Sequence, residues 1–527
     1  MATTIHEAEW KPRHNPWAIA ITVTIATFME VLDTSIANVA LPHIAGSVGA
    51  SQEEATWVLT SYLAASAVIL PISGWLSNRF GRKRFYMTCV VMFTLSSLLC
   101  GLAPTLPLLI FARILQGLGG GGLAPSEQAI LADTFSIEKR GQAFALYGAA
   151  VVIAPAIGPT LGGWITDNYN WHWIFFINLP IGLLSLYLSN RMVEDSPEII
   201  AKTKRRDPID YIGLISVAFG VAMLEFTLDK GQENDWFGSV EIQITALLAT
   251  VTLLFFIWWE WRHPDPIVDL KLLKNRNFGT AVFLQMILGM VLFGSTVLIP
   301  QYLQGLLHYT AERAGMALSP AGLGMMVMMV IAGRTLGKND PRLTVMLGYM
   351  ATAAGLFNLT RLDLNASFGA VTLWRLLQMI GLPFIFIPIS TLNYVGVPRE
   401  KSNQISSLSN FARNIGGSAG TALLTTYLAR SAQVQQVALS ANITQGSYAL
   451  NRYTSSFADG MKTSVAAAQT GALSSAYNQM LLQANMLAYK TAFALLATVM
   501  LVLSPLVWIM RLPPKRTPID PEQLAAH

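Results

Sequence analysis

The chain has 527 residues, of which 53% are hydrophobic and only 12% are charged. Ordinary soluble proteins carry about 25% charged residues, so this composition excludes a soluble globular enzyme, a disordered protein and a disulfide-stabilised scaffold. The net charge of +5 does not indicate nucleic-acid binding, because the basic residues lie in short loops between apolar segments. The composition predicts an all-α polytopic membrane protein.

A transmembrane helix needs about 20 mostly apolar residues. The sequence predicts fourteen such spans, at residues 16–40, 54–74, 86–104, 107–130, 143–165, 173–191, 210–228, 241–260, 278–300, 314–333, 343–360, 369–392, 405–428 and 486–510. The thirteenth is the least apolar of them, because it is rich in Ser, Asn and Gly. Most of the 35 Lys and Arg residues lie at the termini or in loops after even-numbered spans. Basic loops are cytoplasmic, so we expect both termini in the cytoplasm.

An internal repeat divides the chain into two halves. The motif Arg113-x-x-Gln116-x-x-Gly119 recurs 262 residues later as Arg375-x-x-Gln378-x-x-Gly381, and Glu138-Lys139-x-x-Gln142 recurs at the same offset. Two parallel six-helix halves are similar to the major facilitator fold. The expected parts are a cytoplasmic N-terminus (1–15), the first half (16–191), a cytoplasmic linker (192–209), two inserted helices (210–260), the second half (278–510) and a cytoplasmic C-terminus (511–527). A long outward loop at 429–485 is either a solvated helical excursion or a docking surface for an external partner.

The end of the first span carries two acids. Glu30, Asp33, Thr34 and Asn38 share one helical face. Two carboxylates three residues apart in a low-dielectric cavity cannot both ionise cheaply, so we expect one of them to bind and release protons. The alternative is that Asp33 only pairs with a neighbouring arginine such as Arg113.

The fourth span holds Arg113, Gln116 and Glu127. A charge inside a membrane is costly and indicates a functional site, although Arg113 could also be purely structural. Glu127 lies 14 residues after Arg113, about 21 Å along a helix, so the two side chains are not expected to pair. Glu127 either binds a cationic substrate or a proton, or is hydrated near the cytoplasmic end. The glycines between them permit close helix packing or local flexing.

Two further motifs contain glycine. The fifth span carries Gly148, Pro155, Gly158, Pro159, Gly162 and Gly163. Its small residues make a flat packing face and its prolines favour a bend. Between the second and third spans lie Gly74, Asn78, Arg79, Gly81 and Arg82, which fit a tight turn with arginines that reach neighbouring elements.

These motifs resemble those of the fourteen-span drug:proton antiporters of the EmrB/QacA type, within the major facilitator superfamily. The resemblance implies that Asp33 and Arg113 take part in proton coupling, whereas a role for Glu30 depends on its position alone. It implies that the fifth-span motif is an antiporter motif typical of exporters. The turn after the second span is implied to be a gating loop, although Asn78 replaces its usual acid. Glu127, Gln116, Asn38, Gln378, Asn410 and Arg413 are candidates for the substrate cavity.

The implied function is proton-driven efflux of amphipathic drugs across the bacterial inner membrane by alternating access. The resemblance further implies a periplasmic adaptor (an EmrA-like membrane fusion protein) and a TolC-like outer-membrane channel. We expect no enzymatic activity, no metal and no cofactor, because the sequence has no phosphate-binding loop, metal-ligand cluster or nucleophile triad. Two alternatives remain open: a proton-coupled or facilitative transporter of one small metabolite, and a membrane receptor or scaffold in a transporter fold.

Overall fold

The computed structural model describes residues 12–197, 199–200, 209–335, 340–441, 448–461 and 465–512. Within these ranges the chain is helical and contains no strand. The first half comprises α1 (Pro16–Val48), α2 (Gln52–Phe80), α3 (Arg82–Gly101), α4 (Leu106–Gly120), α5 (Leu123–Thr134), α6 (Ile137–Asn168), α7 (Trp173–Phe176) and α8 (Asn178–Met192). The inserted pair comprises α10 (Tyr211–Lys230) and α11 (Val240–Arg262). The second half comprises α12 (Arg276–Gly305), α13 (Ala311–Thr335), α14 (Pro341–Leu359), α15 (Phe368–Leu392), α16 (Ser402–Ser440), α17 (Tyr448–Met461) and α18 (Val465–Leu503). Short 3₁₀ segments lie at Trp236–Gly238, Leu270–Lys274, Arg399–Lys401 and Ser504–Ile509.

All fourteen predicted spans lie on helices, although the fourth is divided into α4 and α5 and the sixth into α7 and α8. Twelve helical stretches of the described residues are long and apolar enough to cross a membrane. The all-α membrane fold is therefore confirmed. The two other predicted spans form α14 and α16, which are less apolar. The count of fourteen crossings stays a prediction.

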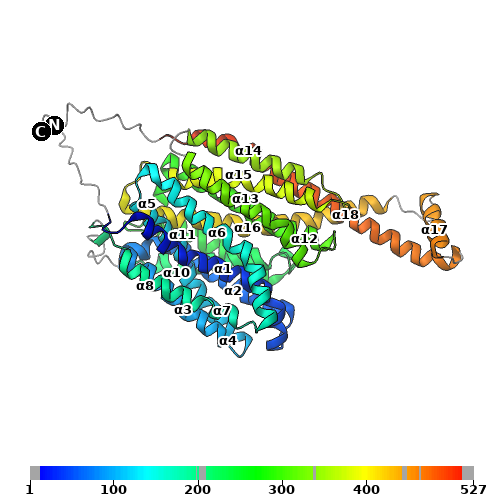
Figure 1. Cartoon of the computed structure of the whole chain (residues 1–527), viewed down its shortest axis with the longest axis horizontal. Coiled ribbons are helices and arrows are strands. Elements are labelled where there is room, and N and C mark those ends of the chain that lie inside the picture. Colours follow the sequence, from blue (N-terminus) through cyan, green and yellow to red (C-terminus); the bar gives the residue numbers. More distant parts are fainter. Residues whose placement is uncertain are drawn as a thin grey trace.

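The helices pack mainly within their own half of the chain. In the first half α1 packs on α6 and α8, while α4 packs on α2 and α3. In the second half α12 packs on α16, and α15 packs on α13 and α14. The halves meet where α6 contacts α13 and where α16 contacts α2 and α5. The inserted helices pair with each other, and α10 rests against α2 (Figure 1).

The glycine run of the fourth span places α4 close to two neighbours. A Cβ on Gly119 would lie 2.7 Å from the backbone nitrogen of Phe93 on α3. Gly117 faces the backbone of Tyr62 on α2 in the same way, and Gly121 faces Ser66. The helix is interrupted between Gly120 and Leu123. Close packing and a local break are thus both present in this run.

The last helices project beyond the bundle. Figure 1 shows α17 and the adjoining ends of α16 and α18 extending past the other helices. Helices α16 and α18 each contain 39 residues, about 58 Å at the helical rise. This is about twice the thickness of a bilayer core, so part of each helix lies outside the apolar layer. The range 429–485, expected as a loop, therefore contains helix in its described parts. Tyr453 bonds Ser475 within this projection at 2.8 Å.

Substitution of Gly119 tests the close packing of α4. We expect Gly119→Ala to lower the thermal unfolding midpoint of the detergent-solubilised protein, because its methyl group would meet the backbone of α3. Gly163→Ala is the matched control, since a Cβ there meets nothing within 4 Å and alanine favours a helix by about 1 kcal/mol. Equal midpoints for the two variants would contradict the close packing.

Candidate proton-coupling and transport site

The carboxylate of Asp33 lies at the centre of a buried hydrogen-bond network. Its Oδ2 pairs with Nη1 of Arg113 at 2.6 Å. Its Oδ1 accepts hydrogen bonds from Nδ2 of Asn178 at 2.6 Å and from Nε2 of Gln116 at 3.0 Å. The side chains of Asp33 and Arg113 are 1% and 0% exposed. The network therefore joins α1, α4 and α8 through one ion pair shielded from water.

The guanidinium of Arg113 is also fixed from α2. Its Nε donates to the carbonyl of Val58 at 3.0 Å, and its Cζ lies 4.4 Å from the ring centre of Tyr62. The ring of Phe175 lies 5.6 Å away on another side. Aromatic faces attract a cation, most strongly where water is absent. The arginine is thus held by an anion, a carbonyl and two rings.

Tyr62 connects the second acid of α1 to this network. Its hydroxyl donates to Oε1 of Glu30 at 3.4 Å, while its ring covers Arg113. Oε2 of Glu30 is buried and has no hydrogen-bond partner among the described residues. Asp33 therefore pairs with Arg113 directly, whereas Glu30 is connected to it only through Tyr62. Thr34 bonds the carbonyl of Val31, and Asn38 is exposed, so neither joins the network.

Glu127 occupies a separate buried position on α5. The hydroxyl of Thr24 on α1 donates to its Oε1 at 2.5 Å, and its Oε2 has no partner among the described residues. Glu127 is 0% exposed. In this conformation α5 packs the carboxylate of Glu127 against α1, and its role stays a prediction.

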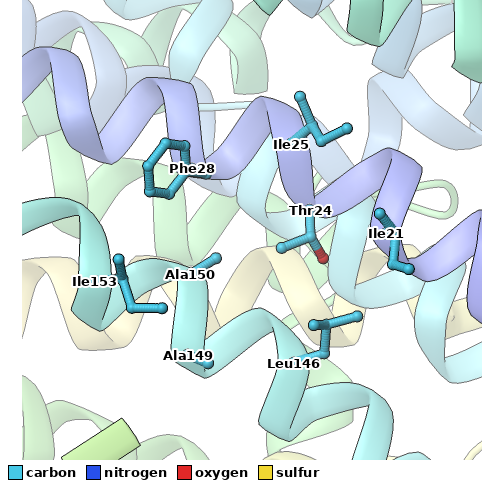
Figure 2. A pocket seen from close by; sticks show the side chains of 8 residues that line it. All are labelled: Ile21, Thr24, Ile25, Phe28, Leu146, Ala149, Ala150 and Ile153. Atoms are coloured by element: carbon cyan, nitrogen blue, oxygen red, sulfur yellow. The ribbon is translucent and has the colours of Figure 1, made fainter. Parts of the chain in front are cut away.

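An apolar pocket lies next to Thr24. It has a volume of about 250 Å³ and is lined by Ile21, Thr24, Ile25, Phe28, Leu146, Ala149, Ala150 and Ile153. Figure 2 shows the lining residues of α1 and α6, with Thr24 of α1 on the side towards α6 and the one polar residue among them. Since Thr24 also bonds Glu127, a single hydroxyl separates this pocket from a buried carboxylate.

Two glycines of the fifth-span motif pack against α1. Gly158 lies against Ser35 and Gly162 against Ile36, so the flat face predicted from the small residues packs on the helix that carries Asp33. Gly148 instead faces Met329 of α13 in the other half. Pro155 and Pro159 lie within the continuous helix α6. Gly163 has open space around it.

The turn between α2 and α3 binds the second half. Arg82 donates to Oδ2 of Asp133 at 2.7 Å and to Oδ1 of Asn403 at 2.6 Å. Asn403 donates to Oδ1 of Asn78 at 2.7 Å, and Ser402 donates to Asp133 at 3.0 Å. We call these five residues the latch cluster, and the end of the bundle where they lie the latch end. Asn78 thus accepts a hydrogen bond from the uncharged amide of Asn403. The carboxylate that pairs with Arg82 comes from Asp133.

The turn's glycines have separate roles. Gly81 has a φ of +91°, which side chains other than glycine rarely adopt. A Cβ on Gly74 would lie 2.8 Å from the Cα of Gln404, so glycine lets α2 touch α16. Arg79 does not join the latch cluster; its Cζ lies 5.9 Å from the ring centre of Trp75.

Other contacts between the halves lie towards the same end. Asn410 on α16 donates to Oε1 of Gln128 at 2.9 Å. Arg413 donates to Asn410 and, at 3.4 Å, to the hydroxyl of Tyr147 on α6. The ring of Tyr147 stacks on Phe386 of α15 at 6.0 Å. The halves are therefore closed against each other at the latch end.

The six predicted cavity residues have different hydrogen-bond partners in this structure, and a shared substrate cavity stays a prediction. Gln116 bonds Asp33, and Gln378 bonds the hydroxyl of Ser295 at 2.8 Å. Asn410 and Arg413 bridge the halves, as described above. The sequence analysis missed Asn178, Ser97 and Tyr62 as members of the Asp33 network; the hydroxyl of Ser97 on α3 accepts hydrogen bonds from Gln116 at 3.1 Å and from Asn178 at 2.8 Å. Asn178 had a visible signal, because it is an amide at the start of an apolar span; Ser97 and Tyr62 look like ordinary span residues.

A double-mutant cycle tests the buried pair. We expect Asp33→Asn and Arg113→Gln each to destabilise the protein strongly, since each leaves one buried charge unpaired, and the double variant to lose less than the sum. The coupling should be about 3 kcal/mol or more, measured from unfolding midpoints at matched scan rates. Asp167→Asn is the control, because its pair with His43 is exposed and contributes little. Additive losses would show that the pair is not coupled.

Loss of Arg82 should open the latch end. We expect Arg82→Gln to lengthen the distance between spin labels at the exposed positions Phe80 and Glu400, because the bonds from Arg82 to Asp133 and Asn403 are lost. Double electron–electron resonance spectroscopy measures the distance between the two spin labels. Arg84→Gln, an exposed arginine on the same turn, should leave it unchanged. An unchanged distance in Arg82→Gln would remove the latch role.

Comparison with known proteins assigns the chain to a family. The model of the Major Facilitator Superfamily matches residues 23–421. The multidrug export protein EmrB of Haemophilus influenzae is 40% identical over 408 residues, which cover 77% of this chain and 79% of that protein. EmrB of Escherichia coli K12 is 39% identical over 409 residues, with the same two shares. The fatty acid resistance protein FarB of Neisseria gonorrhoeae is 34% identical over 496 residues, 94% of this chain and 96% of its own.

Solved structures show the same fold at low sequence identity. The proton:xylose symporter XylE, bound to 6-bromo-6-deoxy-D-glucose, superposes with a TM-score of 0.58 at 14% identity. The match covers 93% of this chain and 96% of XylE. Together with the relatives and the helical bundle described above, this likeness establishes a multi-pass membrane transporter. The chain belongs to the major facilitator superfamily, among the EmrB-type multidrug efflux transporters.

Proposed function

We propose that this protein exports amphipathic and hydrophobic toxic compounds across the bacterial inner membrane in exchange for protons. The observation that carries the proposal is the buried pair of Asp33 and Arg113, with Glu30 joined to it through Tyr62. Charges inside a membrane are costly and persist where they serve ion or substrate movement. The small-residue face of α6 that packs on α1 supports the direction, since it matches the antiporter motif.

Asp33 is the proposed proton carrier. In the ionised state its carboxylate pairs with Arg113 and accepts two further hydrogen bonds. A proton that binds Oδ2 forms an O–H bond and cancels the negative charge, so the attraction to Arg113 weakens. Its release restores the pair. Because the network joins α1, α2, α4 and α8, the two protonation states favour different helix packings, which is the property a coupled transporter requires.

The halves are closed against each other at the latch end, and this arrangement supports transport by alternating access. Rocking of the two halves would open the latch end and close the opposite one. Arg82, Lys83 and Arg84 favour a cytoplasmic location for the latch end. With both termini in the cytoplasm, the described conformation is then the one closed towards the cytoplasm.

The pocket between α1 and α6 supports amphipathic substrates. Its walls are apolar, and Thr24 connects it to the carboxylate of Glu127. A lipophilic compound with a positive or hydrogen-bonding group fits this combination, because the apolar part is buried while the polar group reaches Glu127. Asn38 remains a candidate substrate contact from α1.

The projecting hairpin of α16, α17 and α18 supports an external partner. On the proposed topology it extends into the periplasm, where an EmrA-like adaptor would connect the pump to a TolC-like channel. Its exposed side chains include Val434 and Val437, at 66% and 70% exposure. These two valines are three residues apart on α16, so they share one helix face, and contiguous exposed apolar surface marks contact sites.

Everted membrane vesicles test the coupling. With an imposed pH gradient, we expect the wild type to take up lipophilic dyes and to release protons, and Asp33→Asn to lose both while still binding dye. Asp167→Asn, which changes an exposed acid on α6, should pump normally. Normal pumping by Asp33→Asn would make Asp33 structural and would leave Glu30 and Glu127 as the candidates.

A shortened hairpin tests the partner. Replacement of residues 433–480, which include Val434 and Val437, by a glycine–serine linker should abolish binding of a purified EmrA-like adaptor to nanodisc-embedded protein, while proton-coupled dye uptake by vesicles persists. Unchanged adaptor binding would place the contact elsewhere on the chain.

A further inference from the structure

The second half repeats the Asp33 network without its acid. Arg375 lies 262 residues after Arg113, Gln378 lies the same distance after Gln116, and Ser295 lies the same distance after Asp33. The geometry is repeated as well. Nη1 of Arg375 donates to Oγ of Ser295 at 3.0 Å and to Oε1 of Gln378 at 2.6 Å. Nε2 of Gln378 donates to Ser295 at 2.8 Å, as Gln116 donates to Asp33 at 3.0 Å.

This substitution leaves a positive charge unbalanced. Arg375 is 3% exposed, and none of the ion pairs among the described residues includes it. A serine hydroxyl accepts a hydrogen bond but carries no charge. An unpaired guanidinium inside a membrane is costly, whereas one with a counter-ion is tolerated. Arg375 therefore repeats the two Nη1 hydrogen bonds of Arg113 without its anion.

The guanidinium retains capacity for another acceptor. It has five N–H groups and makes three hydrogen bonds to described residues, the third from Nη2 to Thr296 at 3.2 Å. The hydroxyls of Ser295 and Thr296 direct their own protons to the carbonyl of Leu292. Thr296 is exposed, so the Nη2 edge of Arg375 lies beside an accessible position on α12.

We propose that the free N–H groups of Arg375, beside Ser295 and Thr296 on α12, bind a single anion. A dissociable anion replaces, in the second half, the carboxylate that Asp33 supplies in the first. The site takes chloride or the carboxylate group of a small amphipathic molecule, because both offer one negative charge to the free N–H groups. The inference depends on charge balance and does not depend on what the protein exports.

Anion-dependent stability of the full-length protein tests this site. In nanodiscs of zwitterionic lipid, chloride replaces isethionate at constant ionic strength, and a second series uses octanoate as the carboxylate probe. We expect a saturable rise of about 2–4 °C in the unfolding midpoint of the wild type. A response to chloride identifies an inorganic anion, and a response to octanoate alone identifies a carboxylate ligand; both support the site. No response to either anion overturns it.

Ser295→Asp is the decisive variant, because it restores the residue type of Asp33 and adds a fixed counter-ion. We expect it to be more stable than the wild type in isethionate and to lose the response to added anion. Arg375→Gln should also lose the response. Arg361→Gln, an exposed arginine, should keep it. A wild-type response in Ser295→Asp overturns the proposal, even if Arg375→Gln fails to fold.

Discussion

The first half of this transporter depends on one buried ion pair, that of Asp33 with Arg113. Opposite charges attract strongly where the dielectric is low, and removal of either partner leaves the other without compensation. The pair is held by Gln116, Asn178 and the carbonyl of Val58, so its geometry fixes how α1, α2, α4 and α8 approach one another. The helices can therefore pack in this arrangement only while the charges of Asp33 and Arg113 balance each other. A change in the charge of Asp33 must act on the packing of four helices.

The contact between the halves is built differently. In the latch cluster the ion pair of Arg82 with Asp133 lies within the first half. The bonds that cross to the second half end on uncharged Ser402 and Asn403. Opening the latch end then separates hydrogen-bonded groups, which water can replace, and leaves the ion pair intact. Each such hydrogen bond contributes a net stabilisation of about 1 kcal/mol. The latch end can therefore open at a modest cost in free energy and without separating the ion pair. Asn78 fits this scheme, because an acid there would add a charge beside Asn403.

The sequence predicted the parts of this structure that follow from local pattern. Apolar runs of the length of a bilayer predicted the helices, and the 262-residue offset predicted the two halves. The pairing of Asp33 with Arg113 was anticipated as an alternative to proton coupling, and the structure is compatible with both. Helix faces alone could not show that Asn178 and Ser97 complete the network, because these residues come from other helices. Helix faces alone could likewise not show that Asn410 and Arg413 bond Gln128 on α5 and Tyr147 on α6.

The two halves also show why an internal repeat does not imply equal roles. The arginine and glutamine of the network are kept at both positions, and the acid is present at only one. A carboxylate can gain or lose a proton inside the network, whereas Ser295 cannot at any ordinary pH. If Asp33 carries the proton, the first half alone responds to the gradient through this network. The second half then keeps the same packing around Arg375 with a charge state that protons do not change. Proton-dependent rearrangement is thereby confined to one side of the interface, so the halves can move relative to each other when a proton binds.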